Sequence, residues 1–291
     1  MYTTQINIAN ILIELKSSRS LAELETEDRL ISFLGSPKRP SYQVFFDWSE
    51  NIDDQKISDN LLFDPGKTWK LFQDGSNSCF VFQRGIVDNN KVQVDSIIKT
   101  NSFWNQISIF ERFSSPMFYS IFNTFATNFL IEQSILFTGG VVFHASSLDD
   151  NGKGIVFVGH SGAGKSTQLQ IWDTESGTIL INDDRTAVRI EGGKPICYGT
   201  PWSGSINVSR NHSAPIKALF LLEQASENSI YPVPPSSAIE LLIPRTYLPY
   251  WDKSLMNLAM ENLSRIILKV PIFILRCRPE DAVIQLVRSV I

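Results

Sequence analysis

An apolar run over residues 154–158, with the sequence GIVFV, predicts a buried strand. The run leads directly into residues 159–166, GHSGAGKS, which fit the pattern G-x-x-x-x-G-K-[ST] of a phosphate-binding loop. A short helix, a second apolar strand over 178–181 and the carboxylate pair Asp183 and Asp184 follow. Strand, loop, helix and acidic strand therefore occur in the order that a P-loop nucleotide site requires. This order is far more specific than the loop pattern alone.

The spacing has a physical reason. Glycines let the backbone turn tightly, so that successive N–H groups point at phosphate oxygens, and the helix start adds partial positive charge. We expect Lys165 to reach the β- and γ-phosphates and the Ser166 hydroxyl to contact Mg²⁺. The acidic strand end would supply a second metal contact. The residues predicted to bind the nucleotide are Gly159, Ser161, Gly162, Ala163, Gly164, Lys165, Ser166 and Thr167. The alternative is a chance glycine-rich turn before a helix.

The composition excludes several classes of protein. The 291 residues are 43% hydrophobic and 19% charged, so the chain can build a packed core in one large domain or two ordinary ones. The formal net charge is −4, and no long basic run occurs. A duplex nucleic acid or an anionic membrane would want a basic patch, so neither is expected as a partner.

Cysteine usage and hydropathy suggest a location. Cys79, Cys197 and Cys277 are odd in number and widely spaced, which argues against a disulfide framework and fits a reducing cytoplasm. The first residues carry no basic leader, and no stretch offers 18 uninterrupted apolar residues. We therefore expect a cytoplasmic protein without a signal peptide or a membrane span.

Residues 1–115 read mainly as strands. Polar and apolar residues alternate over 5–8 and 42–45, and residues 68–84 predict a hairpin. No cluster of His, Cys or acidic residues with metal-ligand spacing occurs here. This mainly β N-terminal domain is a candidate for substrate or partner recognition, for assembly, or for a purely structural role.

Residues 116–138 predict a connecting helix that begins at Pro116. Its apolar residues recur at helical spacing, which is typical of a helix face packed on a core. The residues of this stripe are Phe118, Ile121, Phe122, Phe125 and Phe129.

From residue 139 the pattern changes to that of an α/β (α+β) domain. A strand over 141–148 is joined to the strand of the phosphate loop by a short turn, so the two must be antiparallel and the sheet mixed. The remaining expected elements are a hairpin over 185–199, a strand over 217–223, a Pro-rich loop over 231–235, a helix over 253–269, a strand over 272–277 and a helix over 280–290. We therefore expect a P-loop domain over residues 139–291.

Four segments in this domain carry a resemblance: His144-Ala145-Ser146, the loop GHSGAGKST, Asn182 to Arg185, and Tyr198 to Gly204. Their order resembles the HPr kinase/phosphorylase-related proteins, whose nucleotide domain has the phosphoenolpyruvate carboxykinase-like fold. More narrowly, it is similar to stand-alone relatives associated with peptide-modifying gene clusters, including kinases that phosphorylate a serine of lasso-peptide precursors. The resemblance covers roughly residues 139–291.

The resemblance implies a set of roles. Lys165 and Ser166 would bind the phosphates and metal, and His144 would lie near the phosphates. One of Asp183 and Asp184 would help to hold Mg²⁺, and the other would be the base that takes the proton of a Ser or Thr hydroxyl; the sequence leaves the assignment open. The downstream signature of true HPr kinases is not found, so HPr as substrate and phosphorolysis are not expected. The family includes oligomers, so a homo-oligomer is also considered.

The leading hypothesis is an ATP- and Mg²⁺-dependent kinase that acts on a Ser or Thr of a peptide or small protein. Arg185, Arg210 and Arg245 are candidates to neutralise phosphoryl charge. The alternative is a nucleotide-gated module that binds a peptide or partner without productive transfer. A carboxykinase, a GTPase and an ABC-type ATPase are disfavoured, because the chain lacks a second Lys–His constellation, N-K-x-D and L-S-G-G-Q.

Overall fold

The computed structural model describes residues 1–18, 28–35, 39–49, 52, 55–66, 68–87, 91–102, 104–112 and 125–291. The chain divides into two compact units, Met1–Ser134 and Ile135–Ile291. The division falls inside helix α3 (Phe125–Phe137), which is the described part of the predicted connecting helix. Pro116, where that helix was predicted to begin, lies outside the described residues, as do Phe118, Ile121 and Phe122.

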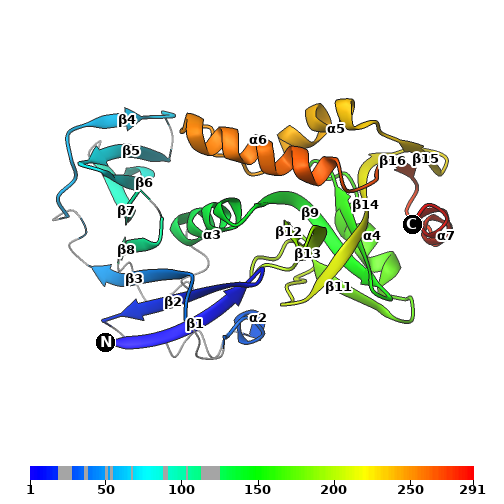
Figure 1. Ribbon diagram of the computed structural model, residues 1–291, viewed down its shortest axis with the longest axis horizontal. Helices are drawn as coiled ribbons and strands as arrows, with labels where there is room; N and C mark the ends of the chain where they lie inside the picture. Colours follow the sequence, from blue (N-terminus) through cyan, green and yellow to red (C-terminus); the bar gives the residue numbers. More distant parts are fainter. Residues whose placement is uncertain are drawn as a thin grey trace. The chain divides into compact units, whose positions relative to one another are not determined.

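The N-terminal unit is built on one eight-stranded sheet, with the order β1-β2-β3-β8-β7-β6-β5-β4 (Figure 1). Its elements are β1 (Tyr2–Ile8), β2 (Ile11–Ser17), α2 (Asp28–Ile31), β3 (Tyr42–Ser49), β4 (Leu61–Phe63), β5 (Trp69–Asp74), β6 (Asn77–Val87), β7 (Lys91–Thr100) and β8 (Gln106–Arg112). The sheet is mixed. β3 pairs in parallel with both β2 and β8, whereas all other neighbouring strands of the sheet pair antiparallel. The mainly β character predicted for this half is confirmed for the described residues.

One face of this sheet holds the core of the unit. Leu15, Val44 and Ile107 are neighbours in the strand register, and each is at most 3% exposed. An aromatic cluster extends this core, in which the ring of Phe80 lies 4.6 Å from that of Phe129 in α3 and 5.5 Å from that of Trp104. The prediction that the aromatic stripe of the helix is a core face is therefore confirmed at Phe129.

The second unit is a mixed α/β assembly. Its elements are β9 (Gly140–Asp150), β10 (Lys153–Val158), α4 (Lys165–Trp172), β11 (Thr178–Asn182), β12 (Arg185–Glu191), β13 (Lys194–Tyr198), β14 (Ser213–Gln224), β15 (Ser229–Pro232), α5 (Pro235–Leu242), η3 (Ile243–Arg245), α6 (Lys253–Ile267), β16 (Ile272–Cys277) and α7 (Ala282–Arg288). β10 pairs antiparallel with β9 and parallel with β14, as the predicted mixed sheet requires. The long strand β9 pairs with β12 through its first half and with β10 and β11 through its second.

Helices cover both faces of the sheet around β10. Successive side chains of a strand point to opposite faces, so neighbouring residues of β10 pack on different helices. Val156 and Val158 belong to a buried cluster with Leu263 of α6. Phe157 belongs to a second buried cluster with Leu169 of α4 and Val283 of α7. The strand of the phosphate loop is therefore buried on both sides, and the loop at its end is held on a rigid element.

The Pro-rich loop predicted over residues 231–235 is confirmed only at Val233 and Pro234. Tyr231 and Pro232 belong to β15, which pairs antiparallel with β16 at the end of the sheet, and Pro235 begins α5. An edge strand tolerates proline, since one side of its backbone needs no partner, and the first helical position tolerates it for the same reason. Within the described residues, no helix combines the length and the apolar character needed to cross a lipid bilayer.

Candidate functional site

The topology of the second unit brings the phosphate loop and the acidic pair to one edge. β10 and β11 both pair antiparallel with β9, on its two sides, so they run in the same direction. Their carboxyl ends therefore lie at the same edge of the sheet. Residues 159–164 follow β10, and Asp183 and Asp184 follow β11. The predicted order of elements is confirmed, and it explains why residues far apart in the sequence meet.

The loop has the backbone that its glycines predict. Gly162 and Gly164 have φ angles of 80° and 102°, in the left-handed region that glycine adopts without strain. A Cβ on Gly159 would come within 2.7 Å of the Cβ of Ala163. Ser161 is exposed in the same loop, Ala163 is buried, and Thr167 lies in the first turn of α4.

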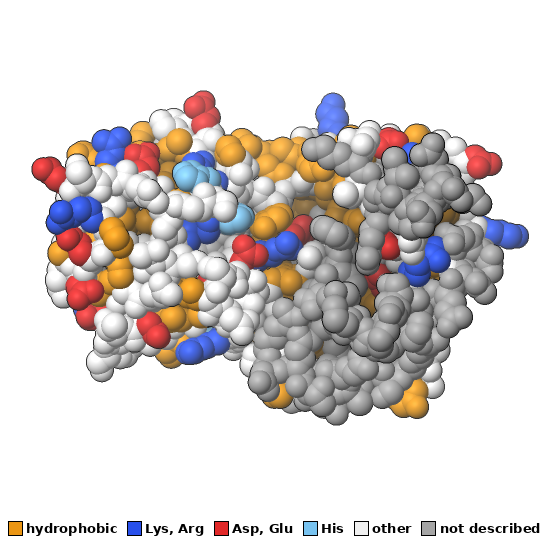
Figure 2. All heavy atoms as spheres, turned by 180° about the vertical axis from the view of Figure 1, so that it is seen from behind, with side chains coloured by type: hydrophobic (Ala, Val, Ile, Leu, Met, Phe, Trp, Pro, Cys, Tyr) orange, Lys and Arg blue, Asp and Glu red, His pale blue; other side chains and the backbone are white. Residues whose placement is uncertain are grey.

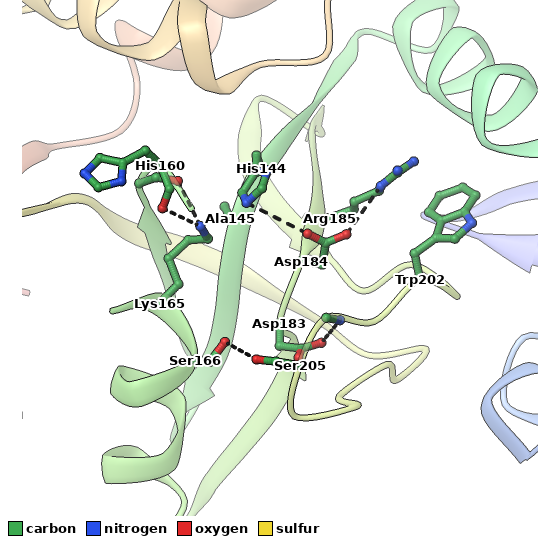
Figure 3. A network of polar contacts seen from close by, with 12 residues as sticks. His144, Ala145, His160, Lys165, Ser166, Asp183, Asp184, Arg185, Trp202 and Ser205 are labelled. Carbon is green, nitrogen blue, oxygen red and sulfur yellow. Dashed lines mark hydrogen bonds and ion pairs between the residues drawn. The ribbon is translucent and has the colours of Figure 1, made fainter. Parts of the chain in front are cut away.

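Lys165 folds back over the loop that precedes it. Its Nζ donates to the carbonyl oxygens of Gly159, at 2.9 Å, and of His160, at 3.1 Å (Figure 3). The residue is only 7% exposed, and this burial lowers the pKa of the Lys165 ammonium, while the nearby charge of Asp184 opposes the shift. The ammonium thus lies at the mouth of the loop, against neutral acceptors that phosphate oxygens could replace.

Asp183 holds a neighbouring loop. Its two carboxylate oxygens accept hydrogen bonds from the backbone N–H groups of Gly204 (2.7 Å), Ile206 (2.9 Å) and Val208 (3.3 Å). The residue is 3% exposed. Most of the acceptor capacity of this carboxylate is therefore directed at the backbone of residues 204–208.

This loop carries a hydroxyl to the phosphate loop. The Oγ atoms of Ser205 and Ser166 lie 3.1 Å apart (Figure 3). Nothing in the sequence singles out Ser205, because its place depends on the contacts of Asp183 about twenty residues earlier. Two hydroxyls and the Asp183 anchor thus form one side of the site.

Asp184 lies on the other side, next to His144. One of its carboxylate oxygens is 3.9 Å from Nε2 of His144, and the other is 3.5 Å from Nε of Arg185 (Figure 3). Its side chain is 27% exposed, so solvent and substrates can reach it. The two adjacent acids therefore point at different neighbours.

His144 is disfavoured as a cation. Burial lowers its pKa most, the charge of Lys165 lowers it further, Asp184 opposes the shift, and Arg185 adds to it. The lowered pKa favours the neutral imidazole at pH 7. It sits where β9 passes from its pairing with β12 to its pairing with β10, opposite Arg185 in the register.

Asn182 fixes the backbone around both acids. It is fully buried, and its Oδ1 accepts from the N–H groups of Asp184 (2.9 Å) and Arg185 (2.7 Å). Its Nδ2 donates to the carbonyl oxygens of Thr200 (3.0 Å) and Trp202 (2.8 Å). From the sequence, Asn182 was named only as part of a segment that carries the resemblance. Its position at the end of β11, directly before the two acids, is the sequence feature that could have identified it as a site residue.

Aromatic rings surround the arginine of this site. The Cζ atom of Arg185 lies 5.4 Å from the ring centroid of Trp202 and 4.9 Å from that of Tyr247. Such contacts favour the cation and limit its motion. Trp202 belongs to the segment from Tyr198 to Gly204 that carries the resemblance, and it is 5% exposed. Sequence patterns did not point to Tyr247.

The remaining predicted arginines differ. Arg245 ends η3, and the charge of Arg245 contributes to the lowered pKa of Lys165, so it lies near the phosphate loop. Arg210 is exposed, and its backbone N–H donates to the carbonyl oxygen of Ile181. Lys165, Arg185 and Arg245 against the two carboxylates of Asp183 and Asp184 leave a net positive charge, which suits a polyphosphate. On the face drawn in Figure 2, histidine side chains lie at the surface beside Lys and Arg side chains.

A divalent cation fits one side of this site. Among the described residues, no three His, Cys, Asp or Glu side chains form a cluster that could hold a metal by themselves. Mg²⁺ does not need one, since it prefers oxygen ligands, keeps several waters and binds through substrate phosphates. On this side the hydroxyls of Ser166 and Ser205 and the carboxylate of Asp183 offer oxygen atoms of the right kind, and Asp184 offers another on the opposite side.

Comparison with known proteins adds little to the geometry. No protein-family model matches the sequence, and no curated protein matches it. Solved structures that are similar include the HPr(Ser) kinase/phosphatase from Coxiella burnetii, with a TM-score of 0.31 and 12% identity over 51% of this chain and 94% of that chain. A TM-score this low does not establish a family, so the function has to be derived from the site itself.

Proposed function

We propose that this protein is an ATP- and Mg²⁺-dependent kinase that transfers the γ-phosphoryl group to a Ser or Thr hydroxyl of a peptide or small protein. Its second unit would then be a phosphoenolpyruvate carboxykinase-like nucleotide domain of the HPr kinase-related type. The observation that carries the proposal is the placement of Asp184. This partly exposed carboxylate lies beside a neutral His144. Both are at the sheet edge where β10 ends and the phosphate loop begins.

The phosphate loop and its lysine would hold the nucleotide. The N–H groups of residues 159–166 and the start of α4 provide donors and partial positive charge for the phosphates. Lys165 would exchange the carbonyl oxygens of Gly159 and His160 for β- and γ-phosphate oxygens. Arg245 and Arg185 add positive charge for the transition state, in which positioning and charge neutralisation account for most of catalysis.

Asp184 is the proposed base. The acceptor oxygen would form its bond to the γ-phosphorus as the bond from that phosphorus to the β,γ-bridging oxygen breaks, and the hydroxyl proton would pass to the Asp184 carboxylate. A neutral His144 beside this carboxylate preserves its basicity, since the charge of an imidazolium would stabilise the anion and weaken it as a base. Oδ1 of Asn182 accepts a hydrogen bond from the backbone N–H of Asp184 at 2.9 Å, and this contact fixes the backbone of Asp184.

Asp183 and Ser166 belong to the proposed metal side. Mg²⁺, when bound, neutralises phosphate charge and orients the transferring group. Ser166 would be a direct ligand, and Asp183 would act by holding the loop that presents Ser205 to it. The two acids therefore divide the roles that the sequence left open. A cytoplasmic location and a homo-oligomer remain parts of the proposal.

Mass spectrometry of Ser- and Thr-containing peptides, incubated with ATP, Mg²⁺ and the protein, tests the proposal. A kinase adds one phosphoryl mass to a Ser or Thr, and Lys165→Ala, which removes the phosphate-binding ammonium, abolishes the gain. If nucleotide binds in a Lys165-dependent manner and peptides bind but none is ever modified, the nucleotide-gated binding module replaces the kinase.

A further inference from the structure

The sheet of the N-terminal unit carries a hollow of about 390 Å³. Most of the residues that line it belong to β2, β3, β8 and β7, which are neighbours in the sheet. The order of these strands can be followed in Figure 1. The register places one residue of each strand in a row across them: Lys16, Phe45, Ser108 and Lys99. Residues in such a row share one face of the sheet, and here it is the face opposite to that of Leu15, Val44 and Ile107. Beyond Lys99 the same face carries a second buried cluster that includes Ile97 and Cys79.

The lining of the hollow is rich in hydrogen-bond donors. Lys16 and Lys99 stand at its two ends, and Gln43 and Gln106, which are paired in the adjacent parallel strands β3 and β8, lie near the row. None of the residues that line it, all of them within the described ranges, is Asp or Glu. Phe45 supplies an apolar floor between the two ammonium groups. The chemistry of this surface therefore favours a ligand that carries negative charge and has an apolar part to cover Phe45.

Both lysines are held in position. The Nζ of Lys99 donates to the carbonyl oxygen of Lys56 at 3.1 Å and to Oε1 of Gln55 at 3.5 Å, and it lies 5.8 Å from the ring of Phe110. These partners are neutral, so they fix the ammonium without compensating its charge.

The second lysine is held by an acid outside the lining. The Nζ of Lys16 lies 2.8 Å from Oε1 of Glu14, and the same oxygen accepts from Nε2 of Gln43 at 3.0 Å. An ammonium has three donors, so Lys16 retains the capacity to bind a further acceptor. The excess of positive charge in the hollow is consequently largest at Lys99.

The spacing of the lysines selects the ligand. Adjacent strands lie about 4.8 Å apart, so three steps separate the Cα atoms of Lys16 and Lys99 by about 14 Å. Each ammonium is held by partners on its own side of the row, so the two offer separate contacts to an anionic ligand. An extended peptide rises about 3.4 Å per residue, so carboxylates at positions i and i+4 are about 14 Å apart and point to the same side.

We propose that this hollow binds an acidic segment of a polypeptide in an extended conformation, with two carboxylates four positions apart on Lys16 and Lys99. We further propose that the segment belongs to the phosphoryl acceptor; this part rests on the proposed function. The N-terminal unit would thereby select the substrate, and the second unit would carry out the transfer.

A binding assay without ATP tests the hollow directly. The probe is a fluorescein-labelled Gly/Ser peptide with two glutamates four positions apart, titrated with the full chain and followed by fluorescence anisotropy. We expect Lys16→Met combined with Lys99→Met to weaken binding by at least about tenfold, or about 1.4 kcal/mol. Replacing the glutamates of the probe by glutamine should have the same effect, and binding should weaken as the salt concentration rises.

Lys70 provides a matched control in the same sheet. It lies on β5 outside the hollow, its Nζ pairs with Asp64 at 3.0 Å, and its side chain is 35% exposed, like that of Lys16. Lys70→Met should leave binding within about twofold, because it changes the net charge without touching the hollow. Equal losses in Lys70→Met and the double variant, equal binding of the glutamine probe, or no binding of the acidic probe would each overturn the proposal.

Steady-state kinetics separate this proposal from the kinase proposal. The double lysine variant should raise the KM for an acidic acceptor peptide and leave kcat unchanged. If the acidic probe binds the hollow but no phosphoryl transfer is found, the binding site stands and the proposed function fails. If transfer proceeds with a KM that the double variant does not change, the kinase stands and the docking site fails.

Discussion

The carboxylate of Asp184 lies 3.9 Å from Nε2 of His144, while the adjacent Asp183 directs its carboxylate at three backbone N–H groups of residues 204–208. Two neighbouring acids at one strand end thus face opposite sides of the same site. One is open to solvent and a candidate base, and the other is buried and holds a loop. Substitutions at the two positions should therefore have different consequences.

Asp183→Asn should destabilise the protein. An amide has one acceptor oxygen instead of two and no charge, so the loop of residues 204–208 loses charge-assisted hydrogen bonds to a buried carboxylate. Such bonds contribute about 1.5–3 kcal/mol each, and we expect the free energy of unfolding to fall by about 2–4 kcal/mol. Chemical denaturation of both variants measures this, with Asp184→Asn expected within about 1 kcal/mol of wild type. Equal destabilisation by both substitutions would contradict the division of roles.

Gly162→Ala should weaken nucleotide binding. Gly162 has φ 80° in the phosphate loop, where an L side chain costs about 1–2 kcal/mol and moves the N–H groups that face the phosphates. Gly152, in the turn between β9 and β10, has φ 83° and provides the control. Both alanine variants should lose similar stability. Calorimetric titration with ADP and Mg²⁺ should show a lower affinity for Gly162→Ala, and similar affinities of the two variants would be inconsistent with a phosphate site at the loop.

Lys165→Met should abolish nucleotide binding and yet preserve or raise stability without nucleotide. Burial lowers the pKa of Lys165, so folding disfavours its ammonium form. Because the folded-state pKa lies below the unfolded one, this penalty is fully present at pH values below the folded-state pKa and disappears above the unfolded one. Lys165→Met removes the charge and with it this penalty. The variant also loses the two hydrogen bonds from Nζ to the carbonyl oxygens of the loop. Thermal unfolding with and without MgATP checks both halves; a markedly less stable variant would show that the lysine holds the loop together.

Stability should fall at acid pH partly through His144. Its pKa is lowered by burial, so the unfolded chain binds the proton more readily than the folded protein does. This contribution to stability is complete above the ordinary pKa of about 6.5 and is lost as the pH falls through the lower folded-state value. His144→Gln should therefore reduce the difference in unfolding free energy between pH 7 and pH 5. An unchanged difference, measured by urea denaturation, would contradict the lowered pKa.

Local patterns were sufficient to predict much of the second unit. The apolar run into the phosphate loop, the short helix and the second apolar strand are each marked by their own residues, and β10, α4 and β11 follow them. Antiparallel pairing of β9 with β10 followed from the short turn between them. Pro232 was misread as part of a loop, because the sequence does not reveal that its strand lies at the edge of the sheet.

The division of roles at the site could not be predicted. Asp183 and Asp184 are adjacent and chemically identical, and their difference arises from N–H groups that arrive more than twenty residues later. Asn182 and Ser205 depend on the same long-range contacts. Motif spacing therefore located the candidate site, whereas the difference between the residues within it depends on tertiary contacts.

The most direct test of the central claim compares Asp184→Asn with wild type in two measurements: calorimetric affinity for ADP with Mg²⁺, and the rate of phosphoryl transfer to a Ser-containing acceptor peptide. If Asp184 is the base, the nucleotide affinity stays within about twofold of wild type, while the rate falls by at least about 100-fold, as the loss of a general base does. Transfer at the wild-type rate by Asp184→Asn, or transfer lost only in proportion to nucleotide affinity, would contradict the account.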